Sequence, residues 1–237
     1  EARGNSDIVL IPSDDYVTLP LSDWRNDAVN LILNSWYLPL ERQYTTSPAT
    51  LNSNQSTINF WYWTGYPSIT EGTRWSDEAC NWGDSDWEDA CSFGDVAAYV
   101  HHHPTCRNRS RLDEFSTPWD AAGIFLHESG HGVFDLSDEY DDGPDCGTHY
   151  HKANPYPNIW RTQLGCENNA WWPDSCHKFT ECGPGGWYKA QPDISLMNCE
   201  CGLYEADGDG IVDDARYPDF PCDWGYDGLR QVGYILE

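Results

Sequence analysis

The apolar run that follows Asp7 is the feature that most constrains what this chain can fold into. Four apolar residues, Ile-Val-Leu-Ile, stand in succession, three of them are β-branched, and Pro12 ends the run. Such a short run is typical of a buried strand. We therefore expect residues 7–12 to form the strand that begins a β-sheet.

Helical and extended segments follow this strand. Ser22 can cap a helix that ends before Pro39 and offers one apolar face to the sheet. The residues of that face recur at helical spacing: Ala28, Val29, Ile32, Leu33 and Trp36. Residues 57–63 and 95–100 are predicted to form further strands before a second helix. The order strand, helix, strand, strand, helix predicts an α/β fold.

The chain is predicted to form a single domain over residues 1–237, because no segment is typical of a flexible linker. After about residue 140 the sequence is rich in Gly, Pro, Asp, Cys and Trp and has little periodicity. Such a composition without periodicity is typical of irregular structure that disulfide bonds stabilise. We expect an N-terminal subdomain of about residues 1–134 and an irregular, disulfide-rich C-terminal subdomain of about residues 135–237.

The charge balance excludes some classes of partner. Lys and Arg number 13 against 39 Asp and Glu, a formal net charge of -26. The field of such a chain repels nucleic acids and anionic membranes, whereas cationic substrates and metal ions suit it. No apolar run approaches the roughly 20 residues that a membrane-spanning helix needs.

Ten cysteines, an even number, lie between Cys80 and Cys222. This density is unusual where thiols are kept reduced, so we expect disulfide bonds and a secreted, extracellular protein. The sequence begins at Glu1 without an initiator Met or a signal peptide, so we expect a processed chain from which a propeptide has been removed. We expect a monomer.

The segment FLHESGHGVFDLSDEY places two histidines four positions apart. Thr117 followed by Pro118 predicts a helix start, with Thr as the cap and Pro at the first helical position. Residues four apart on a helix have Cβ atoms roughly 5–6 Å apart on one face, so His127 and His131 can bind a single zinc ion. Zinc lowers the pKa of its bound water towards about 7, and Glu128 can take the proton of that water and pass it to a leaving amine.

A third ligand must come from beyond this helix. Asp135 would stand about 12 Å along the helix axis from His127, so the chain must fold back. Two glycines beside His131 weaken the helix, and Asp tolerates a left-handed turn, so a bend around Gly132 to Asp135 can return a later carboxylate to the ion. Asp138 is the first candidate for this ligand and Glu139 the second.

The motif resembles that of secreted zinc metallopeptidases of the bacterial IgA-peptidase type, which reads His-Glu-x-Gly-His and then Leu-x-Asp-Glu-Tyr at the same offset. The matching residues are His127, Glu128, Gly130, His131, Leu136, Asp138, Glu139 and Tyr140. A weaker likeness covers the segments DIVLI, INFWYW and NPYPNIW, and the helix after DIVLI. Together these segments span about the first two thirds of the chain.

The resemblance implies an α+β zincin fold of the metzincin type, with a twisted sheet and an active-site helix. It implies that Asp138 is the third zinc ligand and that a Met-containing turn lies beneath the metal. The segment ISLMN holds the only methionine, Met197, and is the candidate for that turn. The chain departs from the family at Asp135, where the family usually has Gly, and in the Asn-Cys-Glu-Cys that follows the turn.

Other segments leave two interpretations open. Tyr140 either donates a hydrogen bond to the oxyanion or holds its loop. The segment YEADGDGIVDD resembles a calcium loop and is otherwise a solvated acidic turn, because Arg216 stands where a bidentate Glu belongs. Its candidate Ca²⁺ ligands are Glu205, Asp207, Asp209, Ile211 and Asp213, with Gly210 at the sharp turn.

Histidines and tryptophans outside the motif have both functional and structural interpretations. Three interpretations are open for His101, His102 and His103. They bind a second metal, they line the rim of the active-site cleft, or they are simply exposed histidines at the end of a strand. Trp61, Trp63, Trp171 and Trp172 stack on sugars or, more simply, pack the core and loops.

The sequence therefore predicts a zinc endopeptidase that hydrolyses peptide bonds in protein or peptide substrates, with Glu128 as general base. Charge complementarity predicts tolerance of Lys or Arg near the scissile bond. Two alternatives stay open. One is a glycan- or surface-binding module that keeps a zincin scaffold without catalysis, and the other is a zinc amidase with a non-protein substrate.

Overall fold

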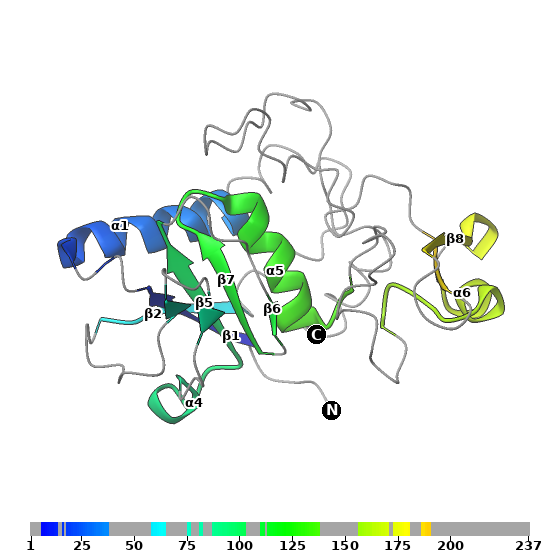
Figure 1. The fold of residues 1–237 in the computed structure, drawn as a ribbon, viewed down its shortest axis with the longest axis horizontal. Helices are drawn as coiled ribbons and strands as arrows, with labels where there is room; N and C mark the ends of the chain where they lie inside the picture. Colours follow the sequence, from blue (N-terminus) through cyan, green and yellow to red (C-terminus); the bar gives the residue numbers. More distant parts are fainter. Residues whose placement is uncertain are drawn as a thin grey trace. The chain divides into compact units, whose positions relative to one another are not determined.

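A computed structural model of the chain describes residues 6–13, 16, 18–37, 58–64, 75–76, 81–82, 87–102, 110–111, 113–137, 156–170, 173–180 and 186–190. The chain divides into two compact units (Figure 1). The first is Glu1–Val133 with Leu236–Glu237, and the second is Phe134–Ile235. Among the described residues, no helix combines the length and the apolar character that crossing a membrane requires.

A five-stranded sheet lies in the first unit. In spatial order its strands are β2 (Ile58–Tyr62), β1 (Ser6–Pro12), β5 (Val96–His101), β7 (Glu114–Pro118) and β6 (Ser110–Arg111). The first four pair in parallel, and β6 is antiparallel to β7. The predicted strands at residues 7–12, 57–63 and 95–100 are confirmed, and the four-stranded parallel sheet agrees with the α/β class.

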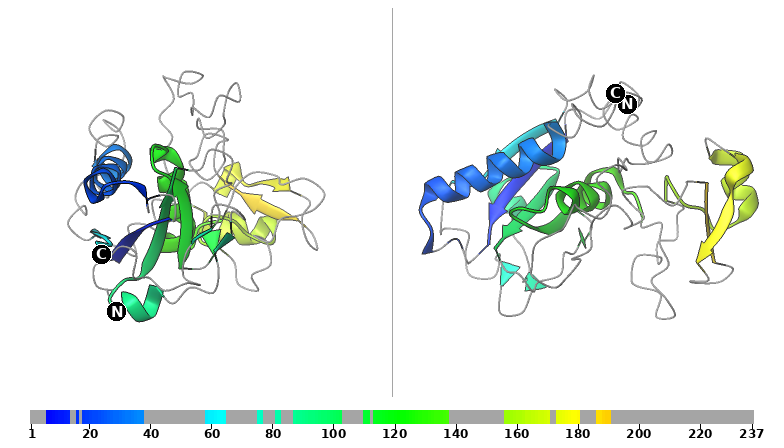
Figure 2. Two further views of the ribbon diagram at one scale, coloured as in Figure 1. Left: turned by 60° about the vertical axis from the view of Figure 1, so that its left-hand side comes forward. Right: turned by 90° about the horizontal axis from the view of Figure 1, so that it is seen from above.

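Two helices cover one face of this sheet. The ring of Phe60 on β2 lies 5.7 Å from that of Trp36 and 6.5 Å from that of Phe125, and Phe115 on β7 lies 5.6 Å from Phe125. These contacts place α1 (Leu21–Ile32), its π-helical extension η2 (Leu33–Tyr37) and α5 (Ala122–Phe134) on the same side of the strands (Figures 1 and 2).

The opposite face of the sheet is covered by the short helix α4 (Trp87–Ala90). Side chains alternate between the faces of a strand, so this face carries every second residue of β1 and β5. They form one buried cluster with the residues that cover them: Val9, Ile11, Trp87, Cys91, Ala97 and Tyr99. Both faces of the central strands are therefore buried, which explains the unbroken apolar run of β1.

Helix α1 differs from its prediction in its cap and in its buried face. Its N-cap is Pro20, which makes no side-chain cap bond, and Ser22 lies inside the helix. The buried residues are Trp24, Asp27, Ala28 and Leu31, whereas Val29 and Leu33 of the predicted face are exposed. Tertiary bonds set this rotation, because the indole of Trp24 donates to the carbonyl of Trp63 at 2.7 Å and Asp27 bonds to two side chains, one at a buried and one at a partly buried site.

The second unit contains more regular structure than its composition predicted. Its elements within residues 156–170, 173–180 and 186–190 are α6 (Gln163–Asn169), the 3₁₀-helix η5 (Pro173–Ser175) and the antiparallel pair β8 (His177–Thr180) and β9 (Trp187–Lys189). A disulfide joins Cys166 to Cys176, and the side chain of Thr162 caps α6. The described part of this unit therefore contains short helices and strands that the sequence did not predict, and its disulfide agrees with the predicted use of disulfides. In the first unit, β3 (Trp75–Ser76) pairs with β4 (Asn81–Trp82).

Candidate metal centre

The motif residues lie on α5, but the helix begins later than predicted. Thr117 and Pro118 belong to β7, where they pair with Val100 and His101 of β5. The predicted Thr cap and proline start are therefore wrong. Pairing along a buried parallel strand outweighs the local capping preference of these two residues. The chain leaves the strand after Pro118, and α5 starts at Ala122.

Packing against the sheet sets the rotation of α5. Phe125 is fully buried against the aromatic rings of the sheet, and one turn later Ser129 donates a 2.6 Å hydrogen bond to its carbonyl. A residue two positions further along a helix is rotated by about 200°. His127 and His131 therefore lie on roughly the opposite side of the helix from Phe125 and Ser129.

The two imidazoles face each other through the same ring nitrogen. The Nε2 atoms of His127 and His131 are 3.2 Å apart, and the ring centroids are 4.9 Å apart with the planes at 87°. Tetrahedral zinc bound to two histidines at about 2.0–2.1 Å places their nitrogens roughly 3.3 Å apart. The separation of the two nitrogens thus matches that of two histidine ligands on one zinc ion.

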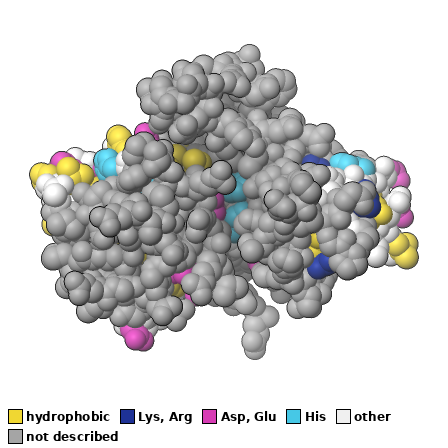
Figure 3. All heavy atoms as spheres, viewed as in Figure 1, with side chains coloured by type: hydrophobic (Ala, Val, Ile, Leu, Met, Phe, Trp, Pro, Cys, Tyr) yellow, Lys and Arg dark blue, Asp and Glu magenta, His cyan; other side chains and the backbone are white. Residues whose placement is uncertain are grey.

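Glu128 follows His127 on the helix, and both residues are buried. Its exposed fraction is 7%, and that of His127 is 5%. Removal from water strengthens the electrostatic effect of a nearby cation on such a carboxylate. Figure 3 shows that some histidine and acidic side chains of the described residues reach the surface.

The remaining predicted site residues lie outside the described residues. They are Asp138, Glu139 and Tyr140, the turn residue Met197, and the acidic loop with Glu205, Asp207, Asp209, Ile211 and Asp213. Within the described ranges, no group of three or more His, Cys, Asp or Glu side chains converges as a metal site. The structure therefore brings together two of the predicted ligands, and the third stays a prediction.

The backbone turns at Asp135, the last residue of the predicted bend, whereas the helix continues unbroken through Gly132 to Phe134. Asp135 has a φ of 57°, in the left-handed region that Asp tolerates better than most residues. A helix cannot continue through this conformation, so the chain changes direction there. Leu136 and Ser137, the two residues that follow, are buried.

Asn158 holds the residue that precedes Asp138. Its side-chain oxygen accepts a 2.9 Å bond from the Ser137 N–H, and its side-chain nitrogen donates a 2.7 Å bond to the Ser137 carbonyl. Asn158 is fully buried. This clamp was missed in the sequence, where Asn158 is one polar residue of the segment NPYPNIW and nothing local indicates a partner 21 positions away.

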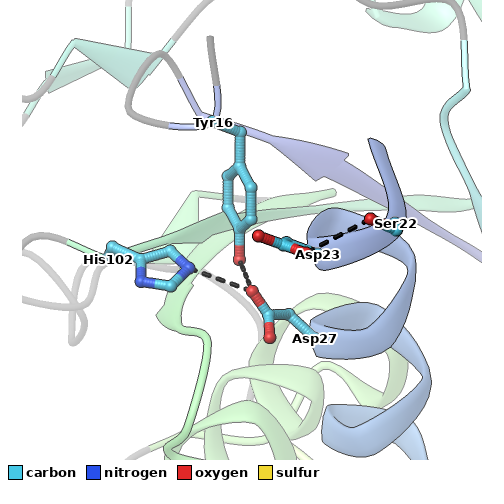
Figure 4. A network of polar contacts seen from close by, with 5 residues as sticks. All are labelled: Tyr16, Ser22, Asp23, Asp27 and His102. Atoms are coloured by element: carbon cyan, nitrogen blue, oxygen red, sulfur yellow. Dashed lines mark hydrogen bonds and ion pairs between the residues drawn. The ribbon is translucent and has the colours of Figure 1, made fainter. Parts of the chain in front are cut away.

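His101 and His102 lie at the end of β5 and pack within the first unit. His101 is the last residue of β5 and is fully buried. Nε2 of His102 lies 3.0 Å from the Asp27 carboxylate, which also accepts a 3.0 Å bond from the Tyr16 hydroxyl (Figure 4). The His102 ring stacks on Trp119 at 4.8 Å. His102 thus ties α1 to the ends of β5 and β7, and His103 lies outside the described residues.

No protein-family model matches the sequence, and no curated protein matches it.

Proposed function

We propose that this chain is a secreted zinc endopeptidase, with His127 and His131 as two of the zinc ligands. The observation that carries the proposal is the 3.2 Å approach of the two Nε2 atoms on α5, where buried Glu128 is the residue that follows His127. Two imidazoles and an adjacent carboxylate on one helix are the groups that metal-assisted peptide hydrolysis uses.

Zinc at this site would acidify a bound water and polarise the peptide carbonyl. Glu128 accepts the proton of the attacking water and returns it to the leaving amine as the peptide bond breaks, so it acts first as general base and then as general acid. Tyr140 is proposed to donate a hydrogen bond to the oxyanion.

The third ligand is proposed to be Asp138, with Glu139 as the alternative. Two features of the second unit support a fixed route for the chain that leads to it. Asp135 turns the backbone through the left-handed region, and Asn158 holds both polar backbone groups of Ser137. A ligand on a fixed backbone loses less conformational entropy when it binds a metal.

The resemblance to IgA-peptidase-type zinc peptidases belongs to this proposal, and so do a metzincin fold and a Met turn at Met197. The turn at Asp135 lies where the resemblance requires the chain to bend. The Cys166–Cys176 disulfide supports an oxidising, extracellular setting. The net charge of -26 supports substrates with Lys or Arg near the scissile bond. The loop from Glu205 to Asp213 is proposed to bind Ca²⁺ in a structural role.

Cleavage of denatured casein by the full-length chain tests this function. The wild-type chain is expected to cleave casein, and a chelator such as 1,10-phenanthroline is expected to stop cleavage until zinc is restored. Glu128→Gln should lose at least about 10²-fold in rate, the low end of what a general base contributes. Glu167→Gln is the matched control, because Glu167 is an exposed glutamate on α6. Equal cleavage by the Glu128 variant and the wild type would show that Glu128 is not the base.

A further inference from the structure

The aromatic residues Trp61 and Phe93 form an exposed pair on the first unit. Trp61 lies on β2 and Phe93 lies between α4 and β5. Their ring centroids are 5.2 Å apart with the planes at 69°, and the two residues are 48% and 54% exposed. Single exposed aromatic residues are common, but two in contact form a small apolar patch at the surface.

Hydrogen bonds fix the Trp61 ring in place. Its Nε1 donates a 2.7 Å bond to Oδ1 of Asp7, which also accepts a 3.0 Å bond from the side chain of Asn59. Asp95, two residues after Phe93, accepts a 2.9 Å bond from the Asp7 backbone N–H. The Asp95 N–H in turn donates to the Asp7 carbonyl at 2.8 Å. The aromatic pair therefore lies beside two carboxylates on a rigid frame.

The two carboxylates keep acceptor capacity. Asp7 uses one carboxylate oxygen for both of its side-chain bonds, and Asp95 uses one oxygen for the backbone of Asp7. Within the ranges that the structure describes, neither carboxylate forms an ion pair with a lysine or arginine. Since the whole chain carries a net charge of -26, the local and the overall potential both favour a cationic ligand.

We propose that Trp61, Phe93, Asp7 and Asp95 form a docking site for an arginine side chain of a partner polypeptide. Guanidinium suits this site because it stacks on aromatic faces and offers a planar set of donors to carboxylates, and it is more weakly hydrated than an ammonium group. The protein contains the same contact internally, since the guanidinium of Arg161 lies 4.0 Å from the centre of the Trp187 ring. The site needs neither zinc nor Glu128.

The indole N–H signal of Trp61 in a two-dimensional ¹⁵N NMR spectrum reports on this site directly. It is identified as the signal that Trp61→Phe lacks. The full-length Glu128→Gln chain, which is not expected to hydrolyse the probes, is titrated with acetyl-Gly-Gly-Arg-Gly-Gly-amide and with the same peptide carrying citrulline, which is uncharged and similar in shape. The arginine peptide should shift the signal saturably, and the citrulline peptide should bind at least about fivefold more weakly.

Two variants keep the reporter and test its neighbours. Phe93→Leu retains an apolar side chain, and Asp95→Asn retains the size of the side chain. Each variant should lower the affinity for the arginine peptide about three- to fivefold. Asp174→Asn removes one exposed charge from η5 and should leave the affinity unchanged. The proposal would be overturned if both peptides shifted the Trp61 signal equally. It would also be overturned if Asp174→Asn and Asp95→Asn lost affinity for the arginine peptide to the same extent. A saturable shift by cellohexaose without one by the arginine peptide would overturn it too and would indicate a glycan platform.

Discussion

Replacement of Asn158 by alanine removes both hydrogen bonds that hold Ser137. The Ser137 N–H and carbonyl are left buried, and an unsatisfied buried polar group costs roughly 1–3 kcal/mol. The deleted amide leaves a small cavity that a water molecule can enter, which offsets part of this loss. We therefore expect Asn158→Ala to lower the free energy of unfolding by about 3 kcal/mol.

Urea unfolding of the full-length chain measures this loss. Asn169→Ala is the matched control, because the Asn169 side chain donates a hydrogen bond to the Gly165 carbonyl at an exposed site, and a change within about 0.5 kcal/mol is expected there. An unfolding free energy of Asn158→Ala within 0.5 kcal/mol of the wild-type value would refute the reasoning.

A second variant at the same position separates the donor from the acceptor. Asn158→Asp retains the acceptor for the Ser137 N–H but places a carboxylate oxygen against the Ser137 carbonyl. We expect this variant to be at least as unstable as Asn158→Ala at neutral pH. It should regain stability as the pH falls, because a protonated carboxyl can donate to the carbonyl and burial disfavours the charged form. No gain at low pH relative to Asn158→Ala would contradict the donor role.

Three further predictions concern the cysteines and the Asp27 network. Burial raises the pKa of the Cys91 thiol above its ordinary value of 9.0, so the folded state keeps this proton where the unfolded chain has lost it. Stability should therefore fall as the pH rises above about 9, and Cys91→Ala should weaken this dependence in urea unfolding at pH 8 to 10. Replacing both Cys166 and Cys176 by serine opens a loop with a sequence separation of 10 and should cost about 2–3 kcal/mol; an unchanged urea midpoint would contradict this. Tyr16→Phe removes the hydroxyl bond to buried Asp27 and should cost about 1 kcal/mol, and an increase in thermal stability would contradict this.

The parts of the fold that could be predicted depend on local pattern. β1 and β5 are central strands buried on both faces, so each contains an unbroken apolar run, residues 8–12 and 96–100, that identifies it. Helix α1 was predicted as a helix, but its buried face was not, because Asp27 looks like a surface residue in the sequence. Tyr16 and His102 bury it, and His102 lies 75 positions away. The strand at Thr117 was missed for a similar reason, since its partner is Val100.

In the candidate metal centre, too, the features set by local pattern could be predicted and those set by distant partners could not. His127 and His131 are one helical turn apart, so helical periodicity alone predicted that they converge, and their Nε2 atoms do. The left-handed turn at Asp135 was also predictable from residue type. The pair of hydrogen bonds between Ser137 and Asn158 could not be predicted. These residues are 21 positions apart, and a hydrogen bond over that distance produces no recognisable pattern in a single sequence.

The zinc K-edge X-ray absorption spectrum tests the central claim most directly. The full-length chain is loaded with zinc, dialysed and measured beside His131→Ala loaded in the same way. We expect one zinc per wild-type chain, with nitrogen and oxygen neighbours at about 2.0–2.1 Å and the outer-shell scattering of two imidazoles. His131→Ala should retain far less zinc, with at most one imidazole. A wild-type chain that releases its zinc on dialysis, or a spectrum without imidazole scattering, would contradict the account.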